Sequence, residues 1–172
     1  GVRIIKLLPN YGYFPDDPAF EAFFTAIDER GMAVLSHCGW LAPRPGMVTA
    51  AYYSHPGRFE KVIRRCVNTT FILAHMGGLA GYLETVMLLT RTPNTYADCS
   101  PGQGIQVLES GGPIVGITPP EKLMFGVDGD GHAGLIPRYA AALERLGMGE
   151  HLEKFFYSNA RGILERIGAI RA

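Results

Sequence analysis

The 172-residue chain has no excess charge of either sign and no long hydrophobic run. Its sixteen Lys and Arg residues equal its sixteen Asp and Glu residues in number, and they form no basic cluster, which argues against a nucleic-acid partner. No apolar stretch approaches the ~20 residues that span a bilayer. No charged segment followed by an apolar h-region opens the sequence, so we expect neither a signal peptide nor a membrane partner.

Cysteine is also scarce, and its spacing excludes a disulfide framework. The three cysteines, Cys38, Cys66 and Cys99, are odd in number and form no CxxC pair, which favours a reducing, cytoplasmic environment. No Walker-type glycine loop follows any apolar run. A nucleotide-binding doubly wound fold is therefore less favoured than other α/β folds.

The residues that are present alternate between strand and helix patterns. We expect strands at 2–8, 32–37, 70–75, 94–99 and 123–128. We expect helices at 18–30, 56–67, 79–90, 103–109, 137–146 and 151–167, with a loop at 111–120. This alternation predicts one α/β domain, residues 1–172, with a parallel sheet. A (β/α)₈ barrel needs eight such units in roughly 250 residues, so five units predict a partial TIM-type barrel.

Three of these apolar runs end on a residue that can bind metal. His37, His75 and Asp128 each close a run, and glycine follows each within two residues. The carboxyl ends of parallel strands meet at one edge, where α/β enzymes place their chemistry. Neutral imidazole and carboxylate are ligands of Zn²⁺ and similar ions. The sequence therefore predicts a metal-assisted active site at this edge.

Strand alternation places each of the three residues on a face with small or apolar neighbours. These neighbours are Ala33 and Leu35 for His37, Phe71 and Leu73 for His75, and Met124 and Gly126 for Asp128. A single strand-end histidine is often only a hydrogen-bonded core residue, and a strand-end aspartate often caps the next helix. Three such residues at equivalent positions favour the active-site interpretation.

Six segments together carry a resemblance to a known family. They are GVRIIKL at 1–7, VLSHCG at 34–39, ILAHMGG at 72–78, PNTYAD at 93–98, LMFGVD at 123–128 and SNAR at 158–161. In order and spacing they resemble the amidohydrolase superfamily, in its branch of metal-dependent hydrolases and decarboxylases related to aminocarboxymuconate-semialdehyde decarboxylase. The resemblance runs from end to end and implies a distorted TIM barrel, with the five strands here as its fourth to eighth.

The resemblance also implies roles for individual residues. It makes His37 the metal ligand of the fifth strand and His75 the sixth-strand histidine that binds substrate or acts as acid or base. It makes Asp128 the eighth-strand aspartate, which binds the metal and helps to activate water. Asn159 and Arg161 match a closing C-terminal motif that is structural. The implied cofactor is a divalent metal, Zn²⁺ above all.

Two departures from the family pattern stand out. The family's first strand carries a His-x-His metal motif, which this sequence lacks. The sequence also starts abruptly in an apolar strand. Both features lead us to expect that strands one to three of the barrel lie outside the given sequence. The family usually has Ser or Thr before the eighth-strand aspartate, and this chain has Val127. That change removes a hydroxyl that could orient the carboxylate.

Several further residues are candidates for binding a small-molecule substrate. Trp40 could form a wall of the substrate pocket, Arg44 and Arg58 could pair with a substrate carboxylate, and His132 could lie beside the site. Ordinary loop packing explains Trp40 equally simply, and a structural or solvated position explains the two arginines and His132 more simply. Lys6 is a pocket or structural residue in this reading, and Cys38, opposite in strand parity to His37, should face the helices.

Three functions stay open at this point. The first is metal-dependent hydrolysis, in which metal-bound water attacks an amide, ester or lactone. The second is metal-dependent decarboxylation of an unsaturated or aromatic acid at the same site. The third is a catalytically inactive partial barrel that acts as an interaction module, because the unpaired edges of an open sheet favour association, including a homo-oligomer.

Overall fold

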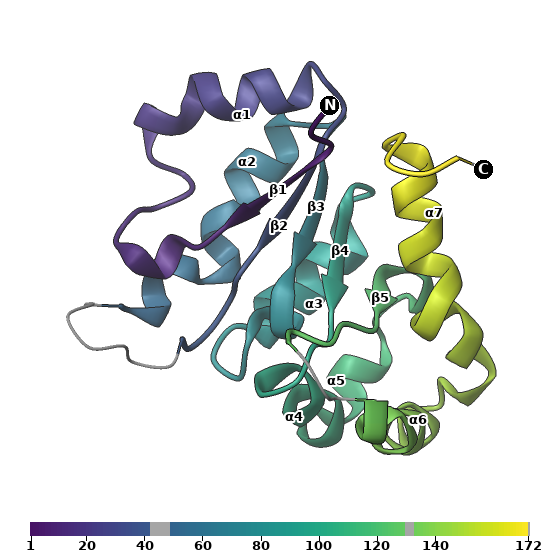
Figure 1. Ribbon diagram of the computed structural model, residues 1–172. Coiled ribbons are helices and arrows are strands. Elements are labelled where there is room, and N and C mark those ends of the chain that lie inside the picture. Colours follow the sequence, from purple (N-terminus) through teal and green to yellow (C-terminus); the bar gives the residue numbers. More distant parts are fainter. Residues whose placement is uncertain (42–48, 130–132, 172) are drawn as a thin grey trace.

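The computed structural model describes residues 1–41, 49–129 and 133–171. Its centre is a five-stranded, all-parallel sheet in the order β1-β2-β3-β4-β5 (Figure 1). The strands are β1 (Ile4–Leu7), β2 (Ala33–Ser36), β3 (Thr70–Leu73), β4 (Thr95–Asp98) and β5 (Leu123–Met124). Sequential neighbours joined by helical crossovers are the arrangement of a barrel wall, so the predicted α/β fold is confirmed as a partial barrel.

The helices follow the strands in alternation. They are α1 (Glu21–Asp28), α2 (Glu60–Arg65), α3 (Tyr82–Arg91), α4 (Gln103–Ser110), α5 (Gly112–Gly116), α6 (Ile136–Arg145) and α7 (Asn159–Arg166). The expected loop at 111–120 is wrong in part, because α5 forms there. Gly112, Gly116 and Pro113 suggested a loop in the sequence. A proline is nevertheless compatible with the first turn of a helix, which is where Pro113 lies.

Each strand also ends earlier than the apolar runs suggested. The second run was expected to continue to His37 and the third to His75, but the ladders stop at Ser36 and Leu73. The fifth was expected to reach Asp128 and stops at Met124. The candidate residues therefore lie in the turns beyond the strands, where the backbone can aim side chains that a strand could not.

The two faces of the sheet are covered by different helices. The helix face carries Val34, Phe71 and Leu73, which pack in one buried cluster with side chains of α1 and α2. The inner face carries Leu35, Ile72, Tyr96 and Met124, which contact Ala160 and Ile163 of α7. Figure 1 shows α1 and α2 on one side of the sheet and α7 on the other. Alternation along each strand separates the two sets.

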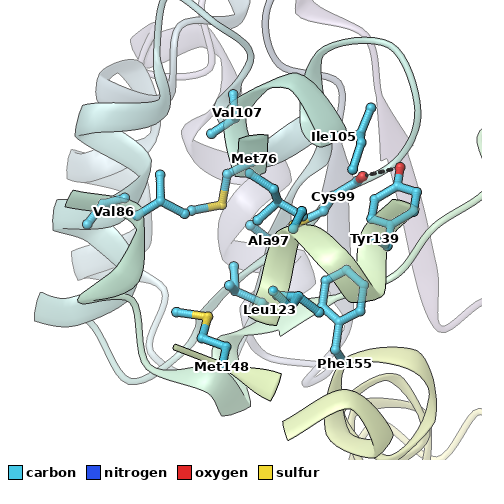
Figure 2. Packing of buried hydrophobic residues seen from close by; sticks show 14 of the residues in the cluster. Met76, Val86, Ala97, Cys99, Ile105, Val107, Leu123, Tyr139, Met148 and Phe155 are labelled. Atoms are coloured by element: carbon cyan, nitrogen blue, oxygen red, sulfur yellow. Dashed lines mark hydrogen bonds between the residues drawn. The ribbon is translucent and has the colours of Figure 1, made fainter. Parts of the chain in front are cut away.

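The largest buried cluster joins β4 and β5 to α3, α4 and α6 on the helix face (Figure 2). Tyr139 of α6 is fully buried in it, and its hydroxyl donates a 2.7 Å hydrogen bond to the carbonyl oxygen of Cys99, directly after β4. Phe125 packs edge-on against the Tyr139 ring, with 5.1 Å between centroids. This contact fixes α6 to the end of the strand that leads into the candidate site.

Three other sequence-based expectations can be compared with the structure. All three cysteines are free and buried, and Cys38 lies in the helix-face cluster, as its parity predicted. In the three described ranges, no helix is both long enough and apolar enough to cross a bilayer.

Replacing Tyr139 by Phe tests the α6 anchor. The variant keeps the ring but leaves the buried Cys99 carbonyl without its partner, so we expect a loss of about 1–3 kcal/mol in the free energy of unfolding. Urea unfolding followed by circular dichroism measures the loss. Tyr52→Phe, at a ring that is 56% exposed, is the matched control and should change stability by less than about 0.5 kcal/mol. Equal effects of the two substitutions would contradict this role of Tyr139.

Candidate active site

His37 lies one residue beyond β2, in a buried position. Its backbone N–H donates to the carbonyl of Leu7 on β1 at 2.9 Å. This bond extends the parallel pairing by one residue and fixes the backbone position from which the side chain projects. The ring is 6% exposed. Its Nδ1 lies 3.1 Å from Nε2 of His75, and its Nε2 lies 3.3 Å from the carbonyl oxygen of Trp40.

Burial above all, together with the neighbouring His75 and Lys6, lowers the pKa of His37 to about 4. The cost of removing a charged ring from water exceeds the opposing effects of the Trp40 carbonyl and the Asp128 carboxylate. His37 is therefore a neutral imidazole at pH 7. Neutral imidazole is the form that binds metal ions.

The side chain of His75 also lies at this site, but its direction does not follow from strand alternation. The expectation that it shares a face with Phe71 and Leu73 is wrong, because those two side chains pack on the helix face. The strand ends at Leu73, and both His75 and Met76 adopt left-handed backbone conformations, with φ of 56° and 54°. This tight turn directs the His75 ring to the His37 ring, with 4.8 Å between centroids.

Asp128 lies near the same nitrogen of the His75 ring as His37 does. It lies four residues beyond the end of β5, has φ of 44°, and its side chain is 55% exposed. Its Oδ2 lies 3.7 Å from Nε2 of His75. His75 is thus the central member of the three candidates, because His37 and Asp128 both lie near its Nε2.

A cavity of about 270 Å³ opens beside these residues at the carboxyl ends of the strands. Leu35, Ile72 and Met124 of the inner face form its apolar floor, and Asp128 lies at its wall. Lys6 of β1 also lines the cavity, on the inner face opposite Leu35 in the ladder register. The cavity therefore combines an apolar floor with one cation and carboxylates, as small-molecule sites do.

Asp98 and Ser100 complete the polar contacts, and the sequence analysis assigned them no role. Both are buried, at 9% and 3% exposure. Asp98 Oδ1 accepts from the backbone N–H of His75 at 3.3 Å and of Ser100 at 3.0 Å, and it also contacts Ser100 Oγ. Ser100 Oγ lies 2.8 Å from Nδ1 of His75. Asp98 ends β4 just as the other candidates follow their strands, so the same strand-end rule could have found it.

The predicted substrate-binding residues have more varied places. Trp40 contacts the site through its backbone carbonyl, while its side chain is 70% exposed and borders a separate cavity of about 410 Å³. The guanidinium of Arg58 lies 3.0 Å from Asp16 Oδ2 and 4.0 Å from the centre of the Phe14 ring, so it is already engaged. Arg44 and His132 lie outside the described residues.

The donor types fit a divalent metal, but their number is too small for a complete site. Within the described part of the chain, no group of three or more His, Cys, Asp and Glu side chains could hold a metal ion. A neutral imidazole at His37 and an exposed carboxylate at Asp128 are suitable ligands. Two such side chains alone do not fill a coordination sphere, so a metal would need further ligands.

The low pKa of His37 makes a prediction about stability. The unfolded chain takes up a proton at this position as the pH falls through about 6.5, whereas the folded chain does so only near 4. Stability is therefore lost between pH 6.5 and 4, levels off below, and is unaffected at pH 7, where both states are neutral. We expect the wild type to lose on the order of 3 kcal/mol more than His37→Gln over this interval, by urea unfolding at each pH. Parallel pH profiles for the two proteins would contradict the burial of a neutral ring.

Comparison with known proteins gives matches to families and to solved structures. A TIM-barrel protein from Bordetella bronchiseptica matches with a TM-score of 0.66, 20% identity, and coverage of 98% of this chain and 59% of that one. An amidohydrolase II protein matches with a TM-score of 0.60, 19% identity, and coverage of 95% and 62%. A protein from Lactobacillus casei described as a metal-dependent hydrolase matches with a TM-score of 0.63, 12% identity, and coverage of 90% and 44%. No curated protein matches.

These likenesses establish the fold, and the coverage shows how much of it is here. The chain spans about three fifths of the length of the first two solved structures, in agreement with a partial barrel. The family model described as Amidohydrolase matches residues 1–166, almost the whole chain. The chain therefore belongs to the amidohydrolase family of enzymes.

Proposed function

We propose that this chain forms the part of a metal-dependent hydrolase that carries His37, His75 and Asp128. The observation that supports this most strongly is the placement of three residues from three strand ends around one ring nitrogen, Nε2 of His75. The Lactobacillus casei protein of the same fold is described as a metal-dependent hydrolase, which agrees with the proposal. The remaining metal ligands would come from strands that complete the barrel.

In this proposal, His37 and Asp128 hold a divalent metal, with Zn²⁺ the best match to their nitrogen and oxygen donors. Such a metal, when bound, lowers the pKa of a water ligand and polarises a carbonyl group. His75 stays unliganded, and its Nε2 accepts a proton during the reaction. Asp128, which is half exposed toward the cavity, assists as a second proton acceptor.

The substrate proposed is a small molecule with an amide, ester or lactone group. The floor of Leu35, Ile72 and Met124 would contact its apolar part, since burial of apolar surface supplies most of the binding energy of such ligands. Tight contact with this floor would exclude water other than the one that reacts.

Decarboxylation at the same residues is a second candidate, and one observation favours it. Lys6 lines the cavity that Asp98 and Asp128 also line, so its ammonium group can pair with a substrate carboxylate. Arg58, the other cation considered for this role, is paired with Asp16 instead. A substrate acid would therefore be recognised by Lys6, and Lys6→Met would raise KM for acids while sparing neutral esters and lactones.

Metal content tests the proposal directly. We expect a chain extended to a full barrel to contain about one equivalent of zinc by elemental analysis after dialysis, because the extension supplies the missing ligands. His37→Ala and Asp128→Ala should each lower that content at least tenfold. His151→Ala, at a histidine beside Glu150 and remote in sequence from every strand end, is the control and should retain the metal.

Two results would contradict the proposed metal-dependent function. Zinc content that is unaffected by His37→Ala and Asp128→Ala would show that these residues do not hold the metal. Absence of metal from the extended chain would favour the interaction-module alternative over an enzyme. If metal is present, release of CO₂ from aromatic acids or cleavage of esters and lactones decides between the two reactions.

A further inference from the structure

We propose that Asp98 and Ser100 are positioning residues that set the proton positions on both histidines, His75 directly and His37 through it. The four side chains form one buried chain of contacts, from Asp98 to Ser100 to His75 to His37. All four are less than 10% exposed, so water does not offer substitute partners. The functional meaning of this arrangement rests on the proposed function, whereas the proton positions themselves can be measured independently of it.

The direction of the chain is fixed at its Asp98 end. Two backbone N–H groups, of His75 and Ser100, already donate to Asp98 Oδ1, so this oxygen acts as an acceptor. The Ser100 hydroxyl, which contacts the same oxygen, must then donate to it, because a carboxylate has no proton to give. With its own proton used, Ser100 Oγ can only accept from its next neighbour, Nδ1 of His75.

The donor and acceptor roles of His75 and His37 follow in the same way. If His75 carries its proton on Nδ1, a neutral His75 has a lone pair on Nε2. That lone pair accepts from Nδ1–H of His37 across 3.1 Å. His37 then has no proton on Nε2. One anionic side chain thereby places the protons of two neutral imidazoles, each on Nδ1.

The reverse arrangement satisfies the contacts less well. A proton on Nε2 of His37 would donate to the Trp40 carbonyl at 3.3 Å, an oxygen that already accepts from Gln103 Nε2 at 2.9 Å. The neutral rings would then require Ser100 to donate to His75, which leaves no proton between Ser100 Oγ and Asp98 Oδ1. A buried pair of facing acceptors costs more than the loss of a second, long bond to Trp40.

This assignment specifies what each ring can do. Nε2 of His37 keeps its lone pair, which makes it the nitrogen that would bind a cation. Nε2 of His75 carries no proton of its own, accepts from His37 and lies 3.7 Å from Asp128, so His75 is set to accept a proton first rather than to donate one. Asp98 and Ser100 also line the cavity, and in this account they act on the reaction through His75.

Nitrogen NMR of the histidine rings tests the inference on the chain itself. Long-range ¹H–¹⁵N correlation of ¹⁵N-histidine-labelled protein reports which ring nitrogen carries the proton, and at pH about 8 an ordinary imidazole is neutral. The chain has five histidines, and His37→Gln and His75→Gln assign the two signals. We expect a protonated Nδ1 and a bare Nε2 on both rings.

Substitution of Ser100 supplies the second measurement. In Ser100→Ala the acceptor for Nδ1 of His75 is gone, so we expect the Nε2-protonated form of His75 to become populated and the His37 pattern to change with it. Ser100→Thr retains a hydroxyl and should restore the wild-type pattern. Ser110→Ala is the control, since that exposed hydroxyl donates to the Gln106 carbonyl of its own helix at 2.6 Å, and it should change neither ring.

The outcomes separate this inference from the proposed function. A wild-type His75 protonated on Nε2, or ring patterns that Ser100→Ala leaves unchanged, would overturn it; the wild-type pattern decides this even if Ser100→Ala fails to fold. Addition of zinc to the extended chain is read on the same spectra. Expected proton positions without any response of His37 Nε2 to zinc would refute the metal site and leave the positioning role intact.

Discussion

The parallel ladder between β2 and β3 is the constraint on which the candidate site depends. Its register pairs Ser36 with Leu73, so the residues that follow, His37 and Ala74, leave the sheet side by side. Only one further residue separates His75 from this edge. Because parallel strands bring all carboxyl ends to the same edge, β4 adds Asp98 there, and the segment after β5 adds Asp128. A shift of one residue in this register would move His37 to the opposite face of the sheet.

The site also depends on a strained turn that the surrounding packing holds in place. Left-handed backbone at His75 and at Met76 costs roughly 1–2 kcal/mol per residue. Met76 repays part of this cost by complete burial in the main cluster, and the His75 N–H bonds to Asp98. Gly77 allows Thr85 to approach so closely that a Cβ would meet its Oγ1. Strain of this kind, maintained by a rigid core, is a common feature of functional sites.

The sequence alone predicted the architecture and the three central residues, because apolar runs and strand-end polar residues are local signals. It failed where the answer depended on backbone geometry beyond the strands. Strand parity put His75 on the wrong face, since no periodicity rule anticipates two left-handed residues in succession. The partner of Arg58 is Asp16, 42 positions away, a long-range contact that a single sequence does not indicate. Asp98 followed the strand-end rule but lacked the nearby glycine pattern of the other candidates.

The central proposal is that separate strand ends converge on one site that binds a metal and transfers protons. Crystallography of the zinc-loaded extended chain, with anomalous scattering recorded at the zinc edge, tests that claim most directly. We expect one strong anomalous peak within about 2.0–2.2 Å of a His37 ring nitrogen and an Asp128 oxygen, with His75 beside it and still in contact with Ser100. A peak at other residues, or His37 and Asp128 both without a peak, would contradict the account.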